Sequence, residues 1–161
     1  AGIALIGQGL RDWRATGAEI FRPHFLVLLA EGCAEAGDPT AGLRQLTEAL
    51  ALVEATGETW YEPELHRLTG ELSLQRGAGH PGPEPQPEAC FHRAIELARA
   101  RGARSLELRA VTSLSRQWWQ RGKRSEASRM LRACYDGFTE GFDTADLQEA
   151  KALLDEWARA R

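Results

Sequence analysis

The sequence predicts an all-α fold, a solenoid of about eight helices arranged as antiparallel hairpins. Four similar strings end in a glycine, at positions 17, 57, 102 and 141, and a second glycine follows each of the first three by 20 residues. Glycine tolerates the left-handed backbone that ends a helix, so each of these glycines predicts a turn between two helices. Each segment between two such glycines is one arm of a helical hairpin. Two arms make a repeat of about 40 residues, which is typical of stacked helical hairpins.

The composition narrows the classes of partner. The chain has 161 residues, with 20 basic and 23 acidic side chains and a formal charge of −3, which excludes the basic surface of a general nucleic-acid binder. Its three cysteines form no C-x-x-C pair, which favours reduced thiols over a disulfide framework or a zinc site. The longest apolar run, residues 25–30, is too short to cross a membrane, and no secretory signal is visible. We therefore expect a cytoplasmic protein with neither a membrane nor a nucleic-acid partner.

The first segment, residues 1–17, aligns with the second helix of a hairpin and lacks a first-helix partner. One arm of a hairpin cannot bury its apolar face alone, so we expect a truncated repeat with under-buried apolar side chains. These side chains are Ile3, Ile6, Leu10 and Trp13. The expected consequence is looser packing at this end or self-association through it.

Three full repeats follow within one predicted helical-repeat domain, residues 1–161. Repeat 1 covers residues 18–57, and its turn Gly37-Asp38-Pro39 supplies a helix end, a capping side chain and a first helical residue. Repeat 2 covers residues 58–102 and contains a Pro/Gly-rich segment, 77–87, in which we expect no helix. That segment is either an ordinary surface loop or a polyproline II docking ligand.

Repeat 3, residues 103–141, is followed by a predicted capping helix, residues 142–161. Asp143 or Thr144 can cap its start. Its apolar face is expected to hold Leu147, Ala150, Leu153, Leu154 and Trp157. Its outer face is expected to hold Gln148, Glu149, Lys151, Asp155 and Arg159, as in the polar end cap of a solenoid.

Small residues recur at one position of each arm. The column holds Ala30, Gly70 and Ser115 in first helices, and Gly9, Ala49 and Ala94 in second helices, with Ala133 or Cys134 in the last arm. Large apolar residues precede each column at helical spacing. Helices that present small residues to each other can approach closely, which indicates tight hairpins.

These columns resemble the tetratricopeptide repeat (TPR) pattern. In repeat 3 the matching positions are Val111, Leu114, Ser115, Trp118, Gly122, Ala127, Leu131 and Cys134. Repeat 1 departs from the pattern at Gly42, where alanine is usual, and repeat 2 departs through its insertion and Pro87. The resemblance implies a right-handed superhelix whose repeats are longer than the usual 34 or so residues.

Longer strings resemble a more specific family. They include W-R-A-T-G-A-E, E-L-H-R-L-T-G-E-L and G-F-T-E-G-F-D-T-A-D-L-Q-E-A-K-A-L-L-D-E. They are similar to the C-terminal helical-repeat region of large bacterial signalling proteins, in which a nucleotide cyclase or a DNA-binding activator domain precedes a predicted ATPase. The resemblance covers only the repeat region, because the cyclase and ATPase motifs are absent.

This resemblance implies a non-enzymatic scaffold that holds a protein or peptide, or a neighbouring domain of the same full-length chain. An alternative is a sensor of a small ligand or effector, coupled to an upstream ATPase. A third hypothesis is an enzyme in its own right, which a fold alone does not exclude.

The motifs of common catalytic and cofactor sites are not found. The string Gly77-Ala78-Gly79-His80 lacks the lysine and the helix start of a phosphate-binding loop. The four histidines show no metal-ligand spacing, although Glu62 and His66 can share a helix face. We therefore predict no catalytic residue, no cofactor and no metal.

The TPR resemblance also predicts a concave groove lined by the first helix of each repeat. Its residues are His24, Val27, Glu31, Ala34 and Glu35, then Glu64, Arg67, Glu71, Leu74 and Gln75, then Arg109, Thr112, Arg116, Trp119 and Gln120. The first two repeats are acidic and the third is basic with a tryptophan, which suits an extended peptide charged at both ends. Alternatively, these acids and bases pair with one another, and Trp119 is a wall of the hairpin seam and not an anchor for a partner.

Overall fold

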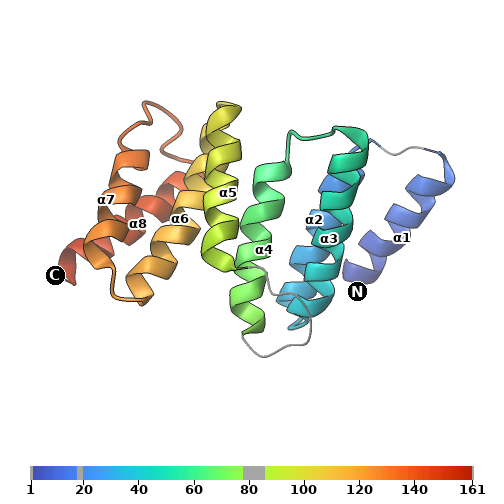
Figure 1. The fold of residues 1–161 in the computed structure, drawn as a ribbon, viewed down its shortest axis with the longest axis horizontal. Coiled ribbons are helices and arrows are strands. Elements are labelled where there is room, and N and C mark those ends of the chain that lie inside the picture. Colours follow the sequence, from blue (N-terminus) through green and yellow to red (C-terminus); the bar gives the residue numbers. More distant parts are fainter. Residues whose placement is uncertain (1, 18–19, 78–85, 161) are drawn as a thin grey trace. The chain divides into compact units, whose positions relative to one another are not determined.

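The computed structural model describes residues 2–17, 20–77 and 86–160 and is all-helical within these ranges, without a β-strand (Figure 1). The predicted all-α class is confirmed. The helices are α1 (Gly2–Ala15), α2 (Arg22–Glu35), α3 (Pro39–Thr56), α4 (Glu62–Arg76), α5 (Pro87–Ala100), α6 (Arg104–Gln120), α7 (Arg124–Tyr135) and α8 (Ala145–Arg159). They form two compact units, Ala1–Pro87 and Glu88–Arg161, each described by itself below.

The predicted turns are confirmed at all seven glycine positions. The φ angles of these glycines lie between 64° and 85°, in the left-handed region that L side chains avoid. Gly57 shows the mechanism, since it caps α3 by donating its N–H to the carbonyl of Val53 at 2.9 Å.

The Pro/Gly-rich segment needs one correction. Pro87, predicted to lie in a non-helical segment, is the first residue of α5. A proline is tolerated there because the first helical N–H has no partner within the helix. Residues 78–85, on which the choice between a surface loop and a docking ligand rests, lie outside the described residues.

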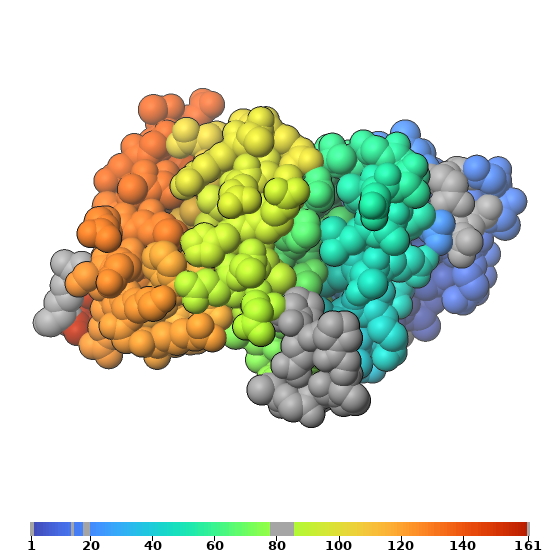
Figure 2. All heavy atoms as spheres, in the orientation of Figure 1, coloured from blue at the N-terminus to red at the C-terminus, as the bar shows by residue number. Residues whose placement is uncertain are grey.

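The first unit is built around the hairpin of α2 and α3, to which α4 adds. Asp38 caps α3 as predicted, because its carboxylate accepts a hydrogen bond from the N–H of Ala41 at 2.8 Å, and Pro39 follows as the first helical residue. The core contains Leu26, Val27 and Ala30 from α2, Leu43, Leu46, Ala49 and Val53 from α3, and Leu65, Leu68 and Leu72 from α4. In the space-filling view of Figure 2, α3 forms most of the front of this unit.

Helix α1 packs on this hairpin only partly. Ile3, Ile6 and Leu10 are half-buried and Trp13 is exposed, so their predicted under-burial is confirmed. A further α1 side chain, Leu5, keeps 72% of its surface exposed.

The second unit has a core to which all four of its helices contribute. Its members include Phe91 and Ile95 from α5, Leu108, Val111 and Leu114 from α6, Ala127 and Leu131 from α7, and Leu147, Ala150, Leu154 and Trp157 from α8. Helix α8 thus buries the predicted apolar face, with Leu153 half-buried, while its predicted polar face is exposed. Thr144 is the capping residue by position, but its hydroxyl donates to the carbonyl of Gly141 instead of accepting from the helix.

The small columns are buried where two helices meet. Ala30, Gly70 and Ser115 are buried, as are Ala49 and Ala94. In the last arm Cys134 is the half-buried member and Ala133 is exposed, and Gly9 on α1 is exposed as well.

Candidate functional site

The predicted groove residues of the first unit do not all reach the surface. Glu35 is exposed, and His24, Glu31 and Ala34 are half-buried. Val27 is fully buried in the core, so its predicted place in an open groove is corrected: the residue packs against neighbouring helices and is inaccessible to a partner.

The predicted groove residues on α4 pair largely with one another. The buried carboxylate of Glu64 accepts two hydrogen bonds from the guanidinium of Arg67, at 2.9 and 2.8 Å. Arg67 also lies 3.6 Å from Glu71. One turn away, His66 lies 3.8 Å from Glu62, so these two residues share a helix face as expected. Leu74 and Gln75 remain exposed at the end of the helix.

The predicted groove residues on α6 face α8. Arg109 donates to the carboxylate of Asp146 at 2.9 Å, and Arg116 forms an ion pair with Glu149. Trp119 stacks on Trp157 with ring centroids 4.6 Å apart and an interplanar angle of 7°.

The basic end of the predicted groove is therefore occupied by the chain's own last helix. These contacts favour the alternatives that the acids and bases pair and that Trp119 is a wall of the seam. Thr112 is buried, which also corrects its predicted place in an open groove, and Gln120 is exposed. The two α8 carboxylates were missed as partners, although their i, i+3 spacing places both on one face of the predicted capping helix.

The first unit contains a set of touching aromatic rings that the sequence patterns did not predict. This aromatic cluster consists of Trp13, Phe21, His24, Phe25, Trp60 and Tyr61. The ring centroids lie 5.9 Å apart for Trp13 and Phe25, 5.9 Å for Phe25 and His24, 5.7 Å for His24 and Trp60, and 6.0 Å for Trp60 and Phe21. The missed signal is the pair of strings F-R-P-H-F and W-Y-E-P, in which aromatic residues stand next to a proline that opens a helix.

Several members of the aromatic cluster are accessible to a partner. Phe21 is 45% exposed and Trp60 is 46% exposed, and Trp13 is exposed as well. Open hollows adjoin the cluster on two sides. One, of about 320 Å³, is lined by side chains of α1 and α2 that include Trp13 and Phe25, and the other, of about 380 Å³, is lined by Phe21 and Trp60. Contiguous exposed apolar surface is typical of sites where a protein binds a partner.

Phe21 has an unusual backbone. Its φ of 62° makes it the one non-glycine residue in the left-handed region among the described residues. Such a conformation costs about 1–3 kcal/mol and persists where neighbouring groups hold it. The carboxylate of Glu58 supplies that hold by accepting a hydrogen bond from the N–H of Phe21 at 2.9 Å.

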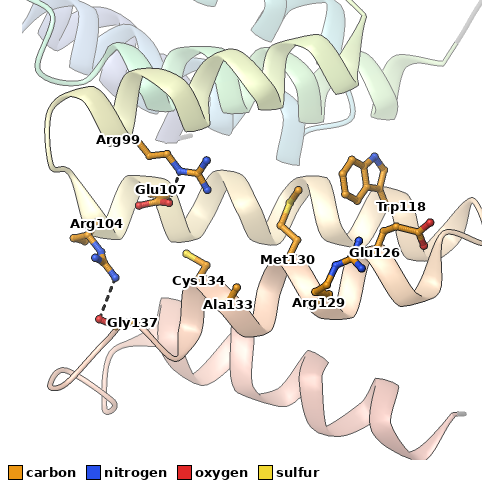
Figure 3. Close-up of a pocket in the computed structure, with 10 residues that line it drawn as sticks. All are labelled: Arg99, Arg104, Glu107, Trp118, Glu126, Arg129, Met130, Ala133, Cys134 and Gly137. Carbon is orange, nitrogen blue, oxygen red and sulfur yellow. Dashed lines mark hydrogen bonds and ion pairs between the residues drawn. The ribbon is translucent and has the colours of Figure 1, made fainter.

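The second unit carries a larger open hollow, of about 630 Å³, between α5, α6 and α7 (Figure 3). Arg99 forms an ion pair with Glu107 at 2.7 Å across its rim, and Arg104 donates to the carbonyl of Gly137 at 3.0 Å. Met130, Ala133 and Cys134 supply an apolar wall. Burial raises the pKa of the Cys134 thiol to about 11, and the nearby carboxylate of Glu107 adds to the shift.

Trp118 at the edge of this hollow anchors α6 to the start of α5. Its indole N–H donates to the carboxylate of Glu88 at 2.8 Å, and the ammonium of Lys123 lies 5.3 Å from its ring centroid. The hydrogen bond from Trp118 lowers the pKa of Glu88, and the positive charges of Lys123 and Arg121 act in the same direction against partial burial.

Within the ranges that the structure describes, no three His, Cys, Asp or Glu side chains gather closely enough to hold a metal ion. None of the described helices combines the length and the apolar composition needed to cross a membrane. No protein-family model matches the sequence, and no curated protein matches it significantly.

Proposed function

We propose that the chain is a non-enzymatic interaction module of a bacterial signalling or regulatory protein that works in the cytoplasm. In this proposal its helical hairpins stack as a TPR-like, right-handed solenoid. The module holds a protein or peptide, or a neighbouring domain of the same full-length chain. Its helical hairpins, and the sequence strings that resemble the repeat region of such proteins, support this role.

The aromatic cluster is the observation that carries the proposal. Its members come from α1, from α2 with the residue before it, and from the turn before α4, so one folded unit brings three separate segments to one surface. Tryptophan and other aromatic residues dominate binding energy at interfaces, because a large ring buries much area with little loss of conformational freedom. The acidic part of the predicted groove, Glu31 and Glu35 on α2, lies further along the helix that carries His24 and Phe25. We therefore assign the partner surface to the first unit.

A photo-cross-linking comparison tests this assignment. Benzoylphenylalanine is placed at Trp60 in one variant and at Phe142 in another, in the full-length protein inside the cells that produce it. The two side chains are matched in exposure, at 46% and 47%, and belong to different units. We expect one defined adduct, to a partner or to a neighbouring domain, from position 60 only. Equal adducts from both positions, or none from position 60, would contradict the assignment.

A second candidate function, the sensing of a small effector, is favoured by the hollow of Figure 3. Its volume of about 630 Å³ lies within the usual range of ligand sites, and arginine and glutamate side chains converge on it. The hollow is open to solvent, whereas ligand sites usually enclose most of the ligand. A thermal-shift screen of small anions on the chain and on Arg129→Ala separates the two functions. If the hollow is a sensor site, an anion should raise the melting temperature of the native chain, and Arg129→Ala should abolish this rise. A docking module predicts no such rise.

A further inference from the structure

The hollow between the starts of α2 and α4 has walls of two kinds. Phe21 and Trp60 present rings at 85° to each other with centroids 6.0 Å apart, and Ile20 and Thr56 complete the apolar part. The remaining lining residue is Glu58, a half-buried acid. The face of an aromatic ring attracts organic cations, and a carboxylate beside it adds a complementary negative charge.

Glu58 is held in place through one of its two oxygens. Oε1 accepts hydrogen bonds from the backbone N–H of Phe21 at 2.9 Å and from the indole N–H of Trp60 at 3.1 Å. These two bonds fix both ring-bearing residues relative to the carboxylate. No described residue forms a hydrogen bond or an ion pair with the second oxygen, Oε2. The carboxylate thus holds Phe21 and Trp60 in place with Oε1, and Oε2 can accept a hydrogen bond from a bound partner group.

The charges around the hollow favour a cation. Residues 1–87 contain 6 arginines, no lysine and 12 acidic side chains, a formal charge of −6. Helix α3 ends at Thr56, so the negative end of its dipole points to the hollow. The starts of α2 and α4 oppose this effect with their positive ends, but the N–H of Phe21, the residue before α2, already donates to Glu58.

We infer that this hollow binds a cationic side chain, the guanidinium of arginine or the ammonium of lysine, presented by the partner. The inference rests on the proposed function and names the chemistry that the partner must carry. The cation lies against the faces of Phe21 and Trp60, and its charge is balanced by Oε2 of Glu58. An apolar side chain in the same place gains nothing from the carboxylate, so charge is what the hollow selects.

The test uses the 161-residue chain and two probes of nearly the same shape, one with a charged guanidinium group and one with a neutral urea group. N-acetyl-arginine methylamide is titrated against N-acetyl-citrulline methylamide while the indole N–H resonance of Trp60 is followed by NMR. We expect a saturable shift of this resonance with the arginine probe and a much weaker response to the citrulline probe. Equal responses to the two probes would overturn the inference, because the hollow would then be a site for a neutral side chain.

The matched variants are Glu58→Gln and Glu54→Gln. Each removes one negative charge from the first unit, but glutamine at position 58 keeps the oxygen that accepts from Phe21 and Trp60, so the turn stays folded. Glu54 is an exposed residue of α3 outside the hollow. We expect Glu58→Gln to lower the affinity for the arginine probe by about two- to fivefold, the scale of an exposed cation–π or ion-pair contact. Glu54→Gln should leave this affinity unchanged. Equal effects of the two variants, or none from Glu58→Gln, would refute the role of Glu58.

This result is separable from the proposed function. A partner that cross-links at position 60 but binds Glu58→Gln as tightly as the native chain would sink the cation inference and leave the interaction module intact. If position 60 gives no partner at all, the proposed function fails, whatever the two probes do.

Discussion

The substitution Gly42→Ala tests how closely α2 and α3 approach each other. Gly42 is a buried residue of α3. A Cβ atom built there would lie 2.9 Å from the carbonyl oxygen of Ala30 on α2 and 2.7 Å from Cδ1 of Leu72 on α4. Both distances are shorter than real Cβ contacts, so Leu72 must change rotamer and α2 and α3 must also separate.

Two opposing effects set the size of the change. Alanine is favoured over glycine within a helix by about 1 kcal/mol. Adding a methyl group to a filled core costs about 1–3 kcal/mol, and the upper half of that range applies because a backbone oxygen cannot move aside as a side chain can. We expect a net loss of about 1–2 kcal/mol in the free energy of unfolding of the first unit.

Hydrogen exchange followed by mass spectrometry measures this loss of stability in the first unit. Amides in the peptides of α2 and α3 should exchange about 5- to 30-fold faster in Gly42→Ala, since each 1.4 kcal/mol is a factor of about ten. Gly9→Ala is the matched control: Gly9 is a helical glycine of α1 with no atom within 4 Å of the added Cβ, so this change should slow exchange in α1 slightly. Slower exchange in Gly42→Ala as well would show that propensity outweighs packing and would refute the reasoning.

Four further predictions concern other parts of the chain. Trp157→Ala removes a buried indole stacked on a ring of α6 and should cost about 3–5 kcal/mol, seen as faster hydrogen exchange throughout α8; unchanged exchange would contradict the packing. The hydrogen bond from Trp118 lowers the pKa of Glu88 below its ordinary 4.5, so its stabilisation is present above pH 4.5 and is lost as the pH falls through the folded pKa. The free energy of unfolding, measured with urea, should therefore fall less at acid pH in Glu88→Gln than in the native chain. The same fall in both would argue against a stabilising role of the Glu88 carboxylate. With a pKa of about 11, only about a thousandth of the Cys134 thiol is ionised at about pH 8, so iodoacetamide should label it far more slowly in the folded than in the unfolded chain. If α1 drives self-association, Trp13→Ser should lower the sedimentation coefficient at high concentration, and an unchanged associating species would exclude this end as the contact.

The all-helical class and the turns could be predicted because both are local properties. Each turn depends on a glycine that reaches a left-handed φ, and each amphipathic helix depends on the spacing of apolar residues along one segment. The Asp38 cap and the proline after it are likewise set within a few residues. Neither kind of feature requires knowledge of what the segment packs against.

The candidate site was predicted less well, because it depends on segments that are distant in the sequence. His24 was placed in a groove, but its ring contacts Trp60 and Tyr61, which lie across a hairpin from it. Arg116 and Trp119 were expected to face a partner, and they contact α8 instead. A helical pattern tells which residues share a face but not which helix covers that face.

The helices, their ends and the small residues between them follow from local sequence, because backbone conformation and amphipathic spacing act over a few residues. Which faces stay open depends on how the helices pack. Tertiary packing buries Val27, places α8 over the basic end of the predicted groove, and joins Phe21, Glu58 and Trp60 around one hollow. The physical reason is that burial and ion pairing depend on distances between segments, and those distances follow from the packing of whole helices.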